Sequence, residues 1–228
     1  MQDPHGSLRE RAIGGGAITI VAQLVRFAIS LGSTMLLARL LRPADFGLVA
    51  MVTAITGFVA MFKDMGLSAA TIQQKAISHE QISTLFWMNV GCGLLLASVV
   101  AALSPAIAWF YDEPRLTRIV PVFALMFVVD GLAVQHQALL IREMRFLILA
   151  MITTLGLASG AVAAIVAALL GAGVWSLVLM HALRAVVIAL GEWVATGWMP
   201  SKPARLCHVR NLLSFGTYLV GFNIVNYI

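Results

Sequence analysis

Charged side chains are few in this sequence. Lys, Arg, Asp and Glu together make up only 11% of the 228 residues, whereas hydrophobic residues make up 61%. Soluble domains usually carry about 25% charged and about 45–50% apolar residues. This shortage of charge excludes an ordinary soluble globular domain and indicates an integral membrane protein.

Cysteine is almost absent as well, and the motifs of enzymes are missing. The two cysteines, Cys92 in an apolar run and Cys207 in a basic segment, indicate neither a disulfide framework nor a metal site. The glycines at 14–16 are not followed by the Lys-Ser/Thr of a phosphate loop, and no nucleophile elbow or zinc-ligand pair occurs. The polar connections are too short for an active-site domain, so we expect no enzyme, no metal and no cofactor.

Apolar runs of about 20 residues, the length that a helix needs to cross the hydrocarbon, recur along the chain. They cover residues 12–41, 46–62, 84–110, 116–140, 146–170 and 174–195. The mixed segment 65–83 is expected to lie on the membrane surface as an interfacial turn or a short amphipathic helix, and not to cross the membrane. The fold class predicted is therefore all-α: a polytopic transmembrane bundle of six complete helices.

Small residues recur every four positions on two of these runs, which predicts close helix packing. The two sets are Gly93, Ala97, Ala101 and Pro105, and Gly156, Gly160, Ala164 and Ala168. The short link 171–173 (Gly-Ala-Gly) predicts that the fifth and sixth runs form an antiparallel hairpin.

Basic residues favour a cytoplasmic N-terminus. The net charge is +5, but no basic stripe is interleaved with aromatics, so nucleic-acid binding is not expected. With the N-terminus inside, inner segments hold nine basic residues and outer segments four, as the positive-inside rule requires. The inner set is Arg9, Arg11, Lys63, Lys75, Arg142, Arg145, Lys202, Arg205 and Arg210, and the outer set is Arg39, Arg42, Arg115 and Arg118. The inner ends are also expected to attract anionic membrane lipids.

The pattern divides the chain into four parts. Residues 1–11 form a polar cytoplasmic tail, 12–195 the six-helix lobe, 196–211 a basic cytoplasmic linker, and 212–228 the start of a seventh helix without a polar flank. Transporters are often built from repeated halves. We therefore expect the N-terminal lobe of a two-lobe transporter, with the second lobe beginning at 212.

Arg26 stands near the middle of the first run, where a charge costs roughly 2.5–3.5 kcal/mol or more. The polar residues around it follow helical spacing and form one stripe: Thr19, Gln23, Arg26, Ser30 and Ser33. The stripe predicts the wall of a water-filled cavity. The alternative is that Arg26 pairs with a carboxylate on a neighbouring helix for packing alone.

Several stretches resemble a known family of bacterial polysaccharide exporters. They are Leu37–Leu41 with Pro43 and Asp45–Gly47, Asp64–Leu67, Ile72–Lys75 with Ile77–His79, Thr84–Gly91, Ala138–Leu140 and Arg142–Phe146. The family is that of the Wzx-like flippases, including the colanic acid exporter type, of the multidrug/oligosaccharidyl-lipid/polysaccharide superfamily. The resemblance implies two six-helix lobes around a central cavity. It also implies transfer of a polyprenyl-pyrophosphate-linked oligosaccharide across the bacterial inner membrane.

Arg26, Asp130 and Arg184 each lie near the middle of a run and hence at similar depth. An arginine fork suits phosphate oxygens, so Arg26 and Arg184 are the candidates for binding the anionic headgroup. Gln23 and Gln137 are candidates for the sugar hydroxyls, although hydrogen bonds for packing explain them equally well.

Asp130 and His181 are the candidates for coupling transport to a proton or sodium ion. A static ion pair explains Asp130 as well as coupling does, and a hydrogen bond to a neighbouring helix is the simpler role for His181.

Two rival functions fit the same composition. The first is a cation-coupled drug or metabolite antiporter of the same superfamily, against which the mid-membrane arginines argue, because a cationic drug would prefer carboxylates. The second is a membrane-embedded glycosyltransferase or polymerase for envelope glycan, which would call for a larger outer loop than any in this sequence.

Overall fold

The computed structural model describes residues 4–60, 68, 71–72 and 77–202. The expected seventh helix at 212–228, residues 203–211 of the linker and, within the segment 65–83, residues 65–67, 69–70 and 73–76 therefore lie outside the described residues.

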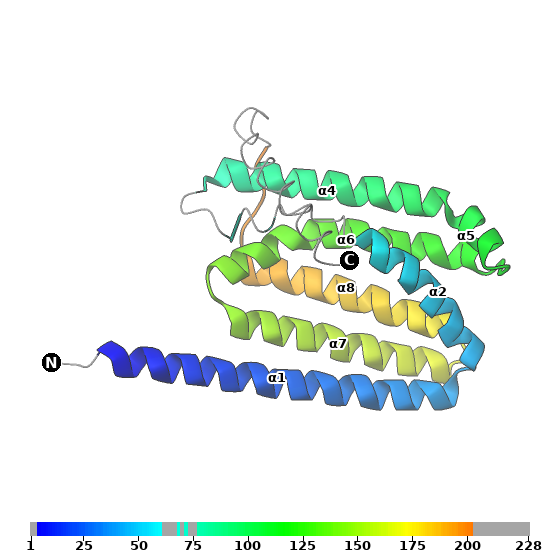
Figure 1. Ribbon diagram of the computed structural model, residues 1–228, viewed down its shortest axis with the longest axis horizontal. Helices are drawn as coiled ribbons and strands as arrows, with labels where there is room; N and C mark the ends of the chain where they lie inside the picture. Colours follow the sequence, from blue (N-terminus) through cyan, green and yellow to red (C-terminus); the bar gives the residue numbers. More distant parts are fainter. Residues whose placement is uncertain (1–3, 61–67, 69–70, 73–76, 203–228) are drawn as a thin grey trace.

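The described residues form seven helices (Figure 1). They are α1 (Pro4–Leu40), α2 (Pro43–Ala60), α4 (His79–Ala102), α5 (Ser104–Phe110), α6 (Leu116–Arg142), α7 (Phe146–Leu169) and α8 (Val174–Thr196). Six of them, all except α5, are long and apolar enough to cross a membrane. The expected all-α bundle of six spanning helices is confirmed.

Three helices begin earlier than expected from the sequence. Helix α2 begins at Pro43 and not at Phe46, because proline suits the first turn of a helix. Helix α1 begins at Pro4, so most of the expected polar tail continues the first helix, whose apolar spanning part is Ile20–Leu40. Helix α4 begins at His79 instead of Thr84, because Ser78 and Gln81 form a capping box. The Ser78 hydroxyl accepts from the Gln81 N–H at 3.2 Å, and the Ser78 N–H donates to Gln81 Oε1 at 2.9 Å.

The expected single span 84–110 is divided. Helix α4 ends at Ala102, and the seven-residue α5 starts at Ser104 with Pro105 in its first turn. Proline has no N–H to donate to the preceding turn, so it suits a helix start and not a helix interior.

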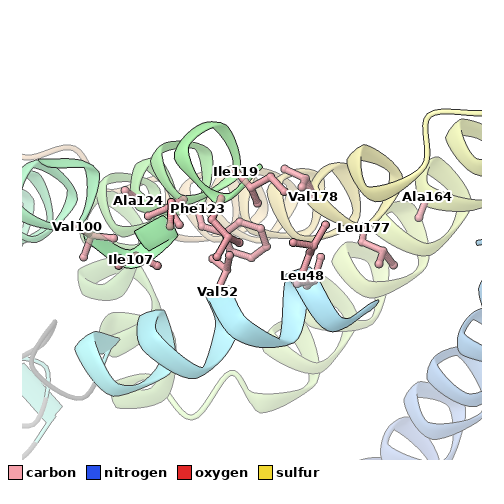
Figure 2. Packing of buried hydrophobic residues seen from close by; sticks show 14 of the residues in the cluster. Leu48, Val52, Val100, Ile107, Ile119, Phe123, Ala124, Ala164, Leu177 and Val178 are labelled. Carbon is pink, nitrogen blue, oxygen red and sulfur yellow. The ribbon is translucent and has the colours of Figure 1, made fainter. Parts of the chain in front are cut away.

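Five helices lie side by side in the order α1, α7, α8, α6, α4, and α2 lies across α6 and α8 (Figure 1). The core lies where α2, α6 and α8 meet (Figure 2), with Val52, Phe123 and Leu177 among its buried side chains. Helix α6 contacts α2, α4, α5, α7 and α8, so it is the central helix of the lobe.

Glycines set the closest helix contacts, as predicted. A Cβ atom built at Gly131 of α6 would lie 2.8 Å from the carbonyl oxygen of Asn89 in α4, and one built at Gly93 would meet the carbonyl oxygen of Phe127. The contact between α7 and α8 is similar, since a Cβ at Gly160 would lie 2.6 Å from the carbonyl oxygen of Met180. The hairpin between α7 and α8 is also confirmed, with positive φ at both of its glycines.

Candidate transport site

The predicted polar stripe of α1 contacts α7 through Arg26. The guanidinium donates from Nη1 to Thr153 Oγ1 of α7 at 2.9 Å, and from Nη2 to Gln23 Oε1, one helical turn away on α1, at 2.7 Å. Arg26 is half-buried and Gln23 is exposed. Sequence reasoning placed Gln23 and Arg26 on one stripe, and the structure brings them into direct contact.

Both hydrogen-bond partners of Arg26 among the described residues are neutral. Neutral partners orient a guanidinium without cancelling its charge. In the described part of the chain Arg26 is therefore held as a cation, and not as half of the packing ion pair considered as the alternative.

Arg184 of α8 meets the same face of α7. Thr153, Gly156 and Gly160 are spaced by three and four residues and so share a face of the helix. A Cβ built at Gly160 would lie 3.3 Å from the Cβ of Arg184, whose side chain is exposed. Thr153 and Gly160 are seven residues apart, or about 10 Å along the helix at 1.5 Å per residue. The two arginines thus meet one face of α7 about two turns apart.

An apolar groove lies between α1 and α7. It has a volume of about 770 Å³ and is lined by Val21, Ala22, Val25, Leu147, Ala150, Met151, Ile152, Thr154, Leu155 and Ala158. Most of its α7 residues recur at helical spacing on the side opposite Gly156. The contact between α1 and α7 therefore has one cationic and one apolar side.

Asp130 and His181 are brought together elsewhere. They line a cavity of about 280 Å³ among α2, α6 and α8, together with Thr53, Thr56, Gly57, Ala60, Phe123, Met126 and Phe127. The rings of His181 and Phe123 have centroids 5.4 Å apart. The candidate residues thus fall into two groups, Gln23 with Arg26 at the α1–α7 contact and Asp130 with His181 in this cavity.

Gln137 belongs to neither group. It is half-buried on α6, while the fully buried Gln135 two positions earlier joins a polar cluster. Asn89 Nδ2 donates to Gln135 Oε1 at 3.3 Å, Gln135 Nε2 donates to the hydroxyl of Thr71, and Arg142 Nη1 donates to the carbonyl oxygen of Thr71. Sequence reasoning missed this cluster, although Asn89 is a polar residue in an apolar run.

The threonines of both groups were missed as well. Thr53, Thr56 and Thr153 each donate to the carbonyl oxygen four residues earlier, at 2.8, 2.9 and 2.9 Å. Such a bond satisfies the hydroxyl within its own helix and leaves its oxygen free to accept. Threonines within apolar runs were the available signal. No three His, Cys, Asp or Glu side chains gather as metal ligands within the described residues.

A known protein family matches this chain. The sequence model of a family described as "Polysaccharide biosynthesis protein" matches residues 36–228, which is most of the chain.

Several similar proteins are named for the biosynthesis of bacterial polysaccharides. The chain is 29% identical over 228 aligned positions to the lipopolysaccharide biosynthesis protein WzxC of Escherichia coli (strain K12), covering 97% of the chain and 46% of the relative. It is 27% identical over 210 positions to the succinoglycan biosynthesis transport protein ExoT of Rhizobium meliloti (strain 1021), covering 92% and 42%. It is 29% identical over 215 positions to the teichuronic acid biosynthesis protein TuaB of Bacillus subtilis (strain 168), covering 92% and 42%.

The chain spans less than half the length of these relatives. No solved structure is significantly similar to it.

Proposed function

Since this chain belongs to the polysaccharide biosynthesis protein family, we propose that it is the substrate-binding lobe of a lipid-linked oligosaccharide flippase. Its substrate is an oligosaccharide on polyprenyl pyrophosphate, which moves from the inner to the outer leaflet of the bacterial inner membrane by alternating access. The relative ExoT is named as a transport protein, which supports transport over enzymatic synthesis.

One observation carries the proposal: Arg26 belongs to the candidate membrane span Ile20–Leu40, and its guanidinium is bound to two neutral partners. A cation at such depth is costly unless it faces water or binds an anion. Pyrophosphate oxygens are the anionic partner that a guanidinium binds through paired hydrogen bonds. Arg26 therefore binds the headgroup, with Gln23 and Thr153 fixing the direction of its fork.

The other candidates take supporting roles. Arg184 meets the same face of α7 about two turns away and extends the positive field along the path of the substrate. Gln23, and Gln137 on α6, donate to sugar hydroxyls. The apolar groove on the opposite side of the α1–α7 contact keeps that side compatible with hydrocarbon, so a lipid chain stays in the bilayer while its headgroup meets Arg26.

The Asp130 cavity supports coupling to a proton or sodium ion. A carboxylate, an imidazole and two threonine hydroxyls line one small space between three helices. Carboxylate and hydroxyl oxygens suit a hard cation such as sodium, and the imidazole can carry a proton. The same cavity is the observation that favours the second candidate, a cation-coupled antiporter of the same superfamily.

The test replaces Arg26 in cells that depend on the protein for surface polysaccharide. Arg26→Gln keeps a polar side chain but removes the charge, so we expect loss of surface polysaccharide at unchanged protein level. Arg26→Lys keeps the charge without the fork and should retain part of the activity. Lys202→Gln removes one positive charge outside the spans and serves as the matched control.

Normal polysaccharide in the Arg26→Gln cells would overturn the proposal. An antiporter would instead show changed efflux of a cationic dye with polysaccharide intact.

A further inference from the structure

A pocket lined by two arginines lies at the end of the bundle where α6 and α8 begin. Its volume is about 500 Å³, within the range of about 300–1,000 Å³ of small-molecule sites. It is lined by Pro114, Arg115, Thr117, Arg118, Ile119, Val174 and Trp175. None of these residues takes part in the Arg26 contact or the Asp130 cavity.

The pocket lies at the level where the membrane spans begin. Leu116 and Val174 are the first residues of two candidate spans. Aromatic side chains mark the same end of the bundle, since Trp175 is 45% exposed and Trp109 at the end of α5 is 84% exposed. Exposed tryptophans at span ends are typical of the lipid headgroup region. A ligand in this pocket therefore meets headgroups on one side and hydrocarbon on the other.

Arg115 is held in place by Glu113. Its Nε and Nη2 donate to the two carboxylate oxygens at 2.8 and 2.9 Å. These side-chain hydrogen bonds lower the pKa of the Glu113 carboxyl below its ordinary value. Within the described part of the chain, Nη1 of Arg115 makes no hydrogen bond, and it remains available to a ligand.

The charged groups of the pocket, Arg115 and Arg118, are hydrogen-bond donors only, and the hydroxyl oxygen of Thr117 is the one side-chain acceptor of its lining. Arg118 is exposed, three residues after Arg115, and its guanidinium makes no hydrogen bond among the described residues. The hydroxyl of Thr117 already donates to the carbonyl oxygen of Pro114 at 2.7 Å. The pocket lining contains no carboxylate. Of the two carboxylates in the preceding turn, Glu113 binds Arg115 and Asp112 lies outside the lining. A neutral sugar needs acceptors for its hydroxyls, and the pocket offers few.

We infer that this pocket binds the phosphate headgroup of an anionic lipid. Phosphate oxygens accept from the two guanidiniums, and Ile119, Val174 and Trp175 form an apolar wall for the glycerol and the first methylene groups. The inference does not depend on the transport proposal, because it concerns other residues, at the ends of α6 and α8, and predicts binding by the resting protein.

Native mass spectrometry of the purified chain tests this site. We expect it to retain phosphatidylglycerol in preference to phosphatidylcholine after reconstitution in mixed vesicles of the two lipids. Loss of a charge-assisted hydrogen bond costs about 1.5–3 kcal/mol, so Arg115→Gln/Arg118→Gln should weaken retention about tenfold or more. Arg39→Gln removes a positive charge at an exposed site at the same end of the bundle, outside the pocket, and should retain phosphatidylglycerol like the unaltered chain.

If Arg39→Gln and the double variant lost phosphatidylglycerol equally, the binding would depend on general surface charge. That result would overturn the site. Unchanged retention in the double variant would also overturn it, and Arg118→Gln alone keeps the test valid if the double variant misfolds. Displacement of phosphatidylglycerol by free glucuronate, but not by inorganic phosphate, would reassign the pocket to acidic sugars and overturn the lipid assignment.

Discussion

The hydroxyl of Thr153 determines the direction of the Arg26 guanidinium. Thr153 Oγ1 accepts from Arg26 Nη1 while its own hydrogen goes to a carbonyl oxygen of the preceding turn. Since the side chain of Arg26 is long and flexible, two fixed acceptors reduce the orientations open to it. Preorganisation of this kind increases the affinity for an anion without adding a contact.

Thr153→Val should therefore reduce transport although Arg26 is kept. Valine keeps the shape of threonine but removes the acceptor, and a hydrogen bond to a charged group is worth about 1.5–3 kcal/mol. We expect about a tenfold lower rate of polysaccharide export at equal protein level, measured as surface polysaccharide formed after induction.

Thr154→Val is the matched control for that variant. The hydroxyl of Thr154 donates to the carbonyl oxygen of Ala150 at 2.7 Å, and the residue lines the apolar groove instead of contacting Arg26. Export should be unaffected. Equal effects of the two valine variants would remove Thr153 from the site.

The contacts of Arg26 and Asp130 could be predicted from the sequence only in part. The stripe that joins Gln23 and Arg26 follows from helical spacing within one helix, so it could be predicted. The partner Thr153 lies 127 residues away, and only the packing of α1 on α7 brings it close. The grouping of Asp130 with His181 and two threonines likewise depends on how α2 packs against α6 and α8, which periodicity within single helices does not encode.

At the scale of helices, long apolar runs predicted the spans, but local signals changed their ends. The Ser78 and Gln81 pair that starts α4 early was a readable capping box, and Pro105 was a readable break. Both signals lie within or beside an apolar run, and the mean hydropathy of such a run does not show them. Capping and proline geometry act on single turns, so they determine boundaries that an average over 20 residues hides.

Gly131→Ala should loosen the contact between α4 and α6. The added Cβ would lie 2.8 Å from the carbonyl oxygen of Asn89 and 3.3 Å from its carbonyl carbon, and backbone atoms cannot rotate away. Overpacking of this kind costs about 1–3 kcal/mol. We expect a thermal unfolding temperature in detergent that is several degrees lower.

The control is Gly91→Ala on α4, where an added Cβ would meet nothing within 4 Å. Alanine favours a helix over glycine by about 1 kcal/mol, so this variant should unfold at the same or a slightly higher temperature. A similar decrease in both variants would show that close backbone contact is not what Gly131 provides.

At the scale of the whole molecule, the lobe has two distinct ends. One end carries the hairpin 171–173, the turn with Glu113 and Arg115, and the pocket lined by Arg115 and Arg118. The opposite end carries residues 197–202 after α8 (Figure 1). The second end is also where the aromatic rings of Phe86, His136, Trp193 and Trp198 pack together. The distribution of basic residues predicts that this second end faces the cytoplasm.

The accessibility of introduced cysteines to a membrane-impermeant reagent tests that orientation. In a variant whose native cysteines are replaced by serine, Leu170→Cys introduces a thiol at an 81% exposed position beside the hairpin, and Lys202→Cys introduces one at the opposite end. A membrane-impermeant maleimide should label the first in intact spheroplasts and the second only after the membrane is permeabilised. Because Val174 directly follows the hairpin, the same result determines which leaflet the pocket of Arg115 and Arg118 faces. The reverse labelling pattern would invert the lobe, place that pocket in the inner leaflet, and remove the positive-inside argument on which the direction of transport depends.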